Sequence, residues 1–330
     1  MDNKIKNDQN KPTKYKKIIE KPQYTRYNWY VNLKKDWRIK MIDIHMHTIY
    51  SDGDKTVEEL LKLCEARKLE YISITDHDTC KQYEDEAFKN NKIFTGKIIK
   101  GSELHASFQN KSIEILAYNI DTDIINKWCE KYYSEEELRK QQKIFKERLF
   151  KICDEHGLVY DKSKIPEPKK ATEFVEQPIY KEVMAHEENH KILGEFTESF
   201  SIFFRKGLAN PESSYFMNHI EFRPKYKEVI DIIHQAGGQA FLAHPFEYKF
   251  KDTIKYIDDL RKEAELDGIE CFHPSSMDDD KKDILVEYAR KNNLYISGGS
   301  DYHGNPKPDI EVGIGRGNLN IPKEIIEEWL

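Results

Sequence analysis

Seven short apolar runs constrain the fold of this chain more than any other feature. They lie near residues 42–47, 71–76, 98–104, 112–118, 239–243, 268–272 and 294–298, and each has the length of a buried strand. Several are followed by apolar residues at helical spacing, over residues 56–68, 226–236 and 279–291. Thr56 with Glu59 forms a capping box at the start of the first of these helices, and Gly237 and Gly238 signal the end of the second. In the third, one apolar face is formed by Ile284, Leu285, Tyr288 and Ala289. This alternation of strand and helix predicts an α/β protein with a largely parallel sheet or barrel.

Residues 121–226 interrupt this rhythm. They are rich in Glu, Lys and aromatic residues, and a long helix is predicted over residues 134–155. We therefore expect an inserted, mainly helical subdomain between the fourth and fifth strands. The α/β part would comprise residues 41–120 and 227–330.

Charge and composition exclude several classes of protein. The 330 residues carry a net charge of −6, which gives no general case for nucleic-acid binding. Residues 1–40 differ, because they hold 12 Lys or Arg against 4 Asp or Glu, interleaved with aromatic residues. Such a segment can bind single-stranded nucleic acid; a basic tail followed by a packing segment is the simpler interpretation.

The predicted compartment is the cytoplasm. The five cysteines show no CxxC pair, which fits reduced thiols, and the polar N-terminus is not a signal peptide. No apolar run approaches the roughly 20 residues that a membrane span needs. We expect no membrane association and no obligatory protein partner.

Histidines and carboxylates gather at the ends of the predicted strands. His45 and His47 stand two residues apart and therefore emerge on one face of the first strand. Asp301 and His303 repeat this spacing after the last strand. The other side chains of this kind are Asp52, in a turn after the first strand, and His77, Glu103 and His244, each at the end of an apolar run.

Such a set of side chains predicts a multinuclear metal site. Imidazole nitrogen and carboxylate oxygen without thiolate suit Zn, Mn or Fe. The ligands outnumber the four of a structural zinc site, so two or three divalent ions are expected. Clusters of this kind activate water and bind phosphoryl oxygens, which makes phosphoester hydrolysis the natural reaction class.

The motifs that contain these residues resemble those of the PHP (polymerase and histidinol phosphatase) family. They are DIHMHT (43–48), SDG (51–53), TDHDT (75–79), GSE (101–103), QAGG (235–238), LAHP (242–245), DGIE (267–270) and GGSDYHG (298–304). TDHDT and GGSDYHG look most like the branch of nucleoside 3′,5′-bisphosphate phosphatases and short-oligonucleotide 5′-exonucleases. The resemblance implies a distorted seven-stranded (β/α) barrel and a site for three ions.

The resemblance also implies a ligand set for each ion. One ion would be held by His45, His47, Glu103 and Asp301, and a second by Asp52, His77 and His303. Glu103 would bridge to a third ion shared with His244. The remaining ligand of that ion is usually a histidine, whereas this chain has Glu114, a harder ligand that favours ions such as Mn. His105, on the strand face of Glu103, is either an alternative ligand or an ordinary histidine at the mouth of the barrel.

The same resemblance implies a hydroxide held between metal ions that attacks phosphorus. Catalytic roles are expected for His77, Asp301 and His303, and for Arg148 as a phosphate-binding arginine on the inserted helix. Alternatively, Arg148 lies on a solvent-exposed face of that helix and has no role in binding. Asp43 either accepts a hydrogen bond from one of the metal-binding imidazoles and so orients it, or simply begins the strand.

Three functions compete. The first is a metal-dependent phosphoesterase acting on a small phosphorylated substrate, a nucleotide or short oligonucleotide. The second is a phosphatase of the histidinol phosphate type, and the third is a non-catalytic PHP module that binds nucleic acid or protein. The insert is expected to choose the substrate, and it contains no readable base-recognition motif.

Overall fold

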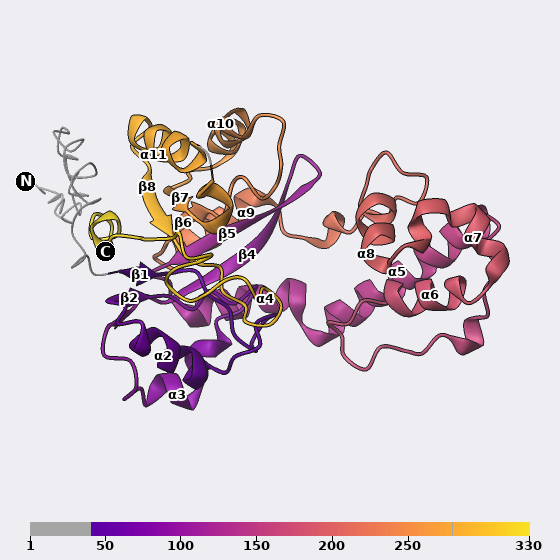
Figure 1. Cartoon of the computed structure of the whole chain (residues 1–330), viewed down its shortest axis with the longest axis horizontal. Coiled ribbons are helices and arrows are strands. Elements are labelled where there is room, and N and C mark those ends of the chain that lie inside the picture. Colours follow the sequence, from indigo (N-terminus) through magenta and orange to yellow (C-terminus); the bar gives the residue numbers. More distant parts are fainter. Residues whose placement is uncertain (1–40, 279) are drawn as a thin grey trace, which may run out of the picture. The chain divides into compact units, whose positions relative to one another are not determined.

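The computed structural model describes residues 41–278 and 280–330, so the expectations for the basic segment 1–40 lie outside the described residues. Strands and helices alternate along much of this part of the chain (Figure 1). The strands are β1 (Ile42–Asp43), β2 (Tyr71–Ile72), β3 (Lys97–Ile98), β4 (Gly101–Phe108), β5 (Lys111–Tyr118), β6 (Gln239–Leu242), β7 (Gly268–Phe272) and β8 (Tyr295–Gly298). The helices are α2 (Val57–Ala66), α3 (Glu86–Lys89), α4 (Thr122–Tyr133), α5 (Glu135–Glu155), α6 (Glu176–Met184), α7 (Glu187–Leu193), α8 (Phe200–Ile202), α9 (Tyr226–Gln235), α10 (Thr253–Glu263) and α11 (Lys281–Lys291).

The strands form two sheets. One is parallel and has the order β1-β2-β3, and the other has the order β4-β5-β6-β7-β8. In the second sheet β5 runs antiparallel to both β4 and β6, whereas β6, β7 and β8 are mutually parallel. The α/β class is therefore confirmed, but a single closed barrel of seven strands is not, because the described residues form eight strands in two sheets.

Isolated bridges join the two sheets beyond the regular ends of β1 and β2. His77 pairs with Glu103 of β4, and Met46, beyond β1, pairs with Tyr302, beyond β8. The regular pairing of β1 and β2 stops after two residues, well short of the predicted 42–47 and 71–76. The regular strand pairing therefore ends just before the histidines that follow β1 and β2, namely His45, His47 and His77.

Local signals set the ends of the helices as predicted. Thr56 caps α2 and Glu59 returns the hydrogen bond, its carboxylate accepting from the Thr56 amide at 2.9 Å. After α9, Gly237 adopts a φ of +80°, which glycine tolerates at a helix end. In α11 the predicted buried face is wrong at Ile284, which is 45% exposed, and Val286 is buried in its place.

Residues 119–238, all of them described, contain helices α4 to α9 and no strand. The predicted long helix corresponds to α5. Much of this segment packs around its own apolar core, which includes Leu149, Ile179, Val183, Leu208 and Met217. The helical character of the insert is thus observed, while its boundaries as a subdomain stay a prediction.

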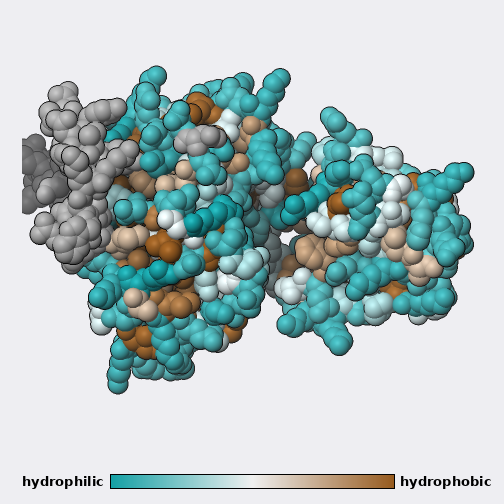
Figure 2. All heavy atoms as spheres, in the orientation of Figure 1, coloured by the Kyte–Doolittle hydropathy of each residue, from teal (hydrophilic) through white to brown (hydrophobic). Residues whose placement is uncertain are grey.

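The rest of the described chain has a second core. Met46, Leu60, Leu61, Ile72 and Ile74 are among the fully buried residues that join α2 to the three-stranded sheet. The face drawn in Figure 2 is mostly hydrophilic, with apolar residues in scattered patches. Within the described residues, none of the helices has the length and apolar character required to cross a bilayer.

Candidate metal centre

Nine of the predicted site residues lie in three overlapping groups whose ligand atoms are within 4.8 Å of one another. The strands explain this meeting, because each side chain lies in a strand or shortly after one, and the isolated bridges bring the strand ends together. The members are His45, His47, Asp52, His77, Glu103, Glu114, His244, Asp301 and His303.

The first group contains His45, His47, Glu103 and Asp301. Oε2 of Glu103 lies 3.1 Å from Nε2 of His45 and 3.2 Å from Nε2 of His47. Oδ1 of Asp301 lies 3.5 Å and 3.3 Å from the same two nitrogens. All four residues are buried. Two imidazoles and two carboxylates therefore point at one small volume.

The second group adds His303, His77 and Asp52 to His47. Nε2 of His303 lies 3.1 Å from Oδ1 of Asp52, and Nε2 of His77 lies 3.8 Å from Oδ2 of the same carboxylate. The Asp52 side chain is 56% exposed. The centre is therefore open to solvent on the side of Asp52.

The third group contains Glu103, Glu114 and His244. Nε2 of His244 lies 2.9 Å from Oε1 of Glu103 and 3.4 Å from Oε2 of Glu114. Glu103 thus uses Oε2 toward the first group and Oε1 toward the third. A bridging role for this carboxylate is compatible with the geometry.

The electrostatics follow from burying opposite charges together. Burial lowers the pKa of His244, but Glu103 and Glu114 outweigh it and raise that pKa to about 10. In the same way, the carboxylates of Asp301 and Glu103 overcome burial and raise the pKa of His47 to about 9. Burial opposes ionisation of Glu103, yet the surrounding histidines hold its pKa well below the usual range. The pocket therefore favours carboxylates in their charged form.

The donor atoms fit divalent cations. Nε2 of His47, Nδ1 of His77 and Nδ1 of His244 are buried and make no well-directed hydrogen bond, which is uncommon for polar atoms inside a protein. For Nε2 of His47 this holds although carboxylate oxygens of Glu103 and Asp301 lie 3.2 Å and 3.3 Å away. Nitrogen and oxygen donors without thiolate suit Mn, Fe or Zn. Positive φ angles of +24° at His244 and +57° at Asp301 place two of these residues in strained backbone, as often occurs at functional sites.

A second layer of residues, for which the sequence predicted no role, holds these side chains in place. Glu270 accepts from Nδ1 of His45 at 2.9 Å and from the amide of His244 at 2.8 Å. His273 lies 3.3 Å from Asp301, which is also paired with Lys307. A signal for His273 was present, because a histidine followed by proline ends β7 as it ends β6.

Asp43 supports the backbone of the centre. Its carboxylate accepts hydrogen bonds from the Ser300 hydroxyl at 2.6 Å, the Ser300 amide at 2.9 Å and the Gly313 amide at 2.7 Å. Burial raises the pKa of Asp43 to about 6, although these bonds lower it. Of the two expectations, orientation of an imidazole ring finds no recorded contact among the described residues. Asp43 instead ties β1 to the segment that presents Asp301.

Arg148 lies on α5, and its recorded contacts are with the C-terminal part of the insert. Its guanidinium is 2.5 Å from Glu221, 3.5 Å from the carbonyl of Asn218 and over the ring of Phe222. Within the described part of the chain, none of these contacts of Arg148 is with the nine clustered side chains. Its role in phosphate binding stays a prediction.

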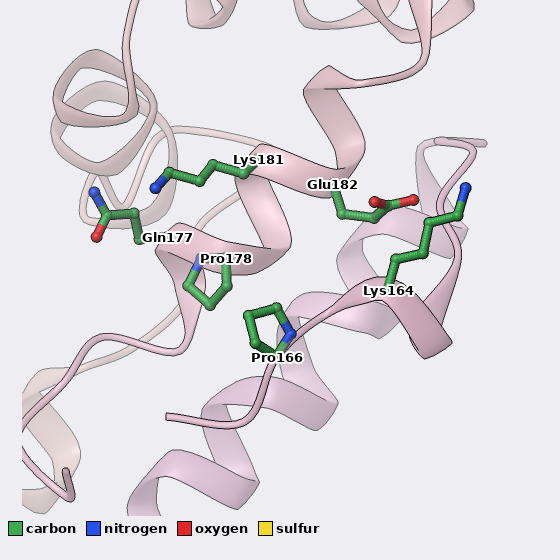
Figure 3. Close-up of a pocket in the computed structure, with 6 residues that line it drawn as sticks. All are labelled: Lys164, Pro166, Gln177, Pro178, Lys181 and Glu182. Carbon is green, nitrogen blue, oxygen red and sulfur yellow. The ribbon is translucent and has the colours of Figure 1, made fainter. Parts of the chain in front are cut away.

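A separate polar pocket of about 320 Å³ lies within the insert (Figure 3). It lies between the segment before α6 and α6 itself, where the rings of Pro166 and Pro178 are neighbours. Lys164, Gln177, Lys181 and Glu182 complete its lining. None of the predicted site residues lines this pocket.

Gly299 tests how closely the centre depends on backbone packing. A Cβ at this position would meet Cβ of His45 at 2.2 Å and its backbone nitrogen at 2.4 Å. We expect Gly299→Ala to lower the free energy of unfolding by about 3 kcal/mol and to weaken metal binding. Chemical denaturation and metal titration measure both effects. Gly207→Ala is the control, because its Cβ would meet only side-chain ring carbons of Phe203 and Phe196, at 3.2 Å or more. Equal losses in the two variants would contradict the packing argument.

Comparison with known proteins places this chain in a family. The PHP domain family matches residues 43–291. The 5'-3' exoribonuclease Rnm of Escherichia coli (strain K12) is 27% identical over 286 residues, covering 82% of this chain and 87% of that protein. The 3',5'-nucleoside bisphosphate phosphatase of Chromobacterium violaceum is 26% identical over 278 residues, covering 82% and 90%.

The fold has relatives of known structure. A crystal structure described as a metal-dependent phosphoesterase from Bifidobacterium adolescentis aligns with a TM-score of 0.58 and 23% identity, covering 88% of this chain and 97% of that chain. The family match spans most of the described residues and contains seven of the nine clustered side chains, while Asp301 and His303 lie beyond its end. The chain belongs to the PHP domain family.

Proposed function

We propose that this protein is a metal-dependent phosphoesterase that hydrolyses phosphate esters of nucleotides or short oligonucleotides. The observation that carries the proposal is the buried carboxylate of Glu103, whose two oxygens face two groups of imidazoles and carboxylates. Relatives named as an exoribonuclease and a nucleoside bisphosphate phosphatase support the substrate class. Two or three ions of Mn, Fe or Zn fit the donor set.

Each part of the centre has a distinct task in this proposal. Divalent ions, when bound, supply an acidified water and neutralise charge on phosphoryl oxygens. Glu103 and Asp301 hold those ions, and Glu270 fixes the ring of His45 through Nδ1. Lys307, 37% exposed beside Asp301, adds a positive charge that attracts a phosphate.

The acid–base state of His77 suits this task. Burial lowers the pKa of His77 to about 4, so the imidazole is neutral near pH 7 and one of its ring nitrogens has a lone pair available for a metal ion. His77 and Asp52 lie on the more exposed side of the centre. We place substrate entry on this side.

Further parts of the proposal concern the surrounding fold. The bridges between the sheets support a distorted barrel around the centre. The separate apolar core of the insert supports a helical subdomain over residues 121–226. In this proposal the subdomain selects the leaving group and Arg148 binds phosphate. The five cysteines are free and buried, which fits a reducing compartment such as the cytoplasm.

A phosphate-release panel on Mn-reconstituted protein tests the function. The substrates are adenosine 3′,5′-bisphosphate, a 5′-phosphorylated dinucleotide, histidinol phosphate and a simple aryl phosphate. We expect release from the two nucleotide substrates, and none from the His77→Ala/Asp301→Ala variant, because that variant loses donors from both main groups.

The other outcomes point to the competing functions. Turnover of histidinol phosphate alone would assign the protein to the other phosphatase class. No release from any substrate, with ions shown to be bound, would reject the hydrolase and favour a PHP module that binds nucleic acid or protein.

A further inference from the structure

His105 stands beside the third group of ligands and is not part of the ligand set that the family resemblance implies. It lies on β4 two residues after Glu103, so the two side chains share a face. Its cross-strand partner in the register is Glu114 of β5. Glu114 occupies the position where the resemblance implies a histidine. The imidazole of His105 lies directly opposite this position, on the neighbouring strand.

The two ring nitrogens of His105 have different partners. Nδ1 lies 2.5 Å from Oδ2 of Asp78, whose Oδ1 accepts the His105 backbone amide at 2.9 Å. Nε2 lies 3.1 Å from Oε1 of Glu114. The other oxygen of Glu114, Oε2, lies 3.4 Å from His244. The Asp78 carboxylate thus contacts the ring nitrogen that points away from the metal centre, and the Glu114 carboxylate contacts the ring nitrogen that points toward it.

His45, in the first group of ligands, has the same arrangement. Its Nδ1 lies 2.9 Å from Glu270, and its Nε2 lies 3.1 Å from Glu103. A carboxylate on the rear nitrogen fixes the tautomer and leaves the front nitrogen free to bind a metal. Asp78 contacts Nδ1 of His105 in the same way as Glu270 contacts Nδ1 of His45.

The position of Asp78 is specifically maintained. Its φ of +53° is a left-handed conformation that few residues adopt without a compensating interaction. Its backbone amide donates to the carbonyl of Glu103 at 2.9 Å, which anchors the turn to β4. The ring of His105 also stacks on that of His77, with centroids 4.8 Å apart.

We propose that His105 is a metal ligand through Nε2, oriented by Asp78, and that it replaces the histidine missing at position 114. His77, His105 and Glu114 offer ligand atoms within 4.8 Å of one another, which extends the centre along β4. Glu114 then bridges the His105 side and the His244 side with its two oxygens. This inference rests on the metal dependence of the proposed function and adds a ligand to that centre.

Metal content per chain is the direct test. Wild-type protein and variants are loaded with Mn²⁺, desalted and analysed by elemental mass spectrometry, with affinities from calorimetric titration of Mn²⁺. We expect His105→Ala to lose about one ion per chain. We expect His105→Ala/Glu114→His to regain it, because the second change returns an imidazole to the centre from the opposite strand.

Asp78→Asn tests the orienting role with little change of shape. The amide oxygen of Asn can still accept the His105 backbone N–H, but the amide nitrogen cannot accept from Nδ1. We expect about 10–100-fold weaker binding of the affected ion. His234→Ala is the matched control, because His234 pairs with Asp267 outside the nine clustered residues, and its metal content should equal that of wild type.

The results separate this inference from the proposed function. If His105→Ala, folded by circular dichroism, keeps all ions at wild-type affinity, His105 is only a hydrogen-bond partner of Glu114 and the inference is rejected. If His105→Ala does not fold, unchanged binding by Asp78→Asn rejects it equally. Loss of an ion in these variants from a wild-type protein that hydrolyses no phosphoester would support the ligand and reject the proposed function.

Discussion

Replacing Glu103 by Gln is expected to lower kcat/KM for phosphoester hydrolysis by about 10³-fold or more. The change keeps the shape of the side chain but removes the charge that faces His45, His47 and His244. A metal centre contributes several kcal/mol to stabilising the transition state, and each 1.36 kcal/mol corresponds to a factor of ten. Steady-state kinetics on the best substrate of the panel, at saturating Mn²⁺, measures the effect.

Glu58→Gln provides the matched control for that variant. Glu58 is an exposed residue of α2 that forms an ion pair with Lys62 on the surface. The kcat/KM of the Glu58→Gln variant should therefore equal that of the wild type. A Glu103→Gln protein with wild-type kcat/KM would show that the two groups do not share this carboxylate in the active enzyme. Elemental analysis of the same sample distinguishes loss of ions from loss of activity with ions retained.

The metal-free protein should lose stability as the pH rises, whereas the metal-loaded protein should not. The pKa values of His244, His47 and His105 are raised to about 10, 9 and 9, in each case because neighbouring carboxylates outweigh burial. Their stabilising protonation is complete below the unfolded value of about 6.5 and is lost as pH rises through the folded values. His77, with a pKa lowered to about 4, acts in the opposite direction but is a single group.

Metal ions change the sign of this dependence. They bind deprotonated imidazole and carboxylate, so their affinity rises with pH. When free metal exceeds its Kd about 1,000-fold, it adds about 4 kcal/mol to the free energy of unfolding and raises Tm by about 10 °C. Thermal unfolding in EDTA and in Mn²⁺, at about pH 6 and about pH 9, measures the gap between the two forms. A metal-free protein that is more stable at about pH 9 than at about pH 6 would contradict the argument.

The sequence contained enough information to predict most elements, because period and capping are local properties. The capping box of Thr56 and Glu59 and the glycine after α9 are both as expected. The sheets were less predictable. Whether β1 and β2 continue as regular strands depends on partners far away in the sequence, and in the structure these strands end after two residues. The separation into two sheets has no local signal.

The site shows the same division between local and distant information. Histidines two residues apart in a strand must share a face, so the pairing of His45 with His47 could be predicted from spacing alone. The partners behind them could not. Glu270 and Asp78 reach their histidines across 225 and 27 residues of sequence, and only the folded chain brings them together.

The bridges between the two sheets give the centre a mechanical role as well as a chemical one. His77 belongs to the three-stranded side and Glu103 to the five-stranded side, and they meet in one such bridge. An ion bound by both residues would cross-link the two sheets. Binding and release of that ion would then change how strongly the two sheets are held together, as well as the activity of the centre.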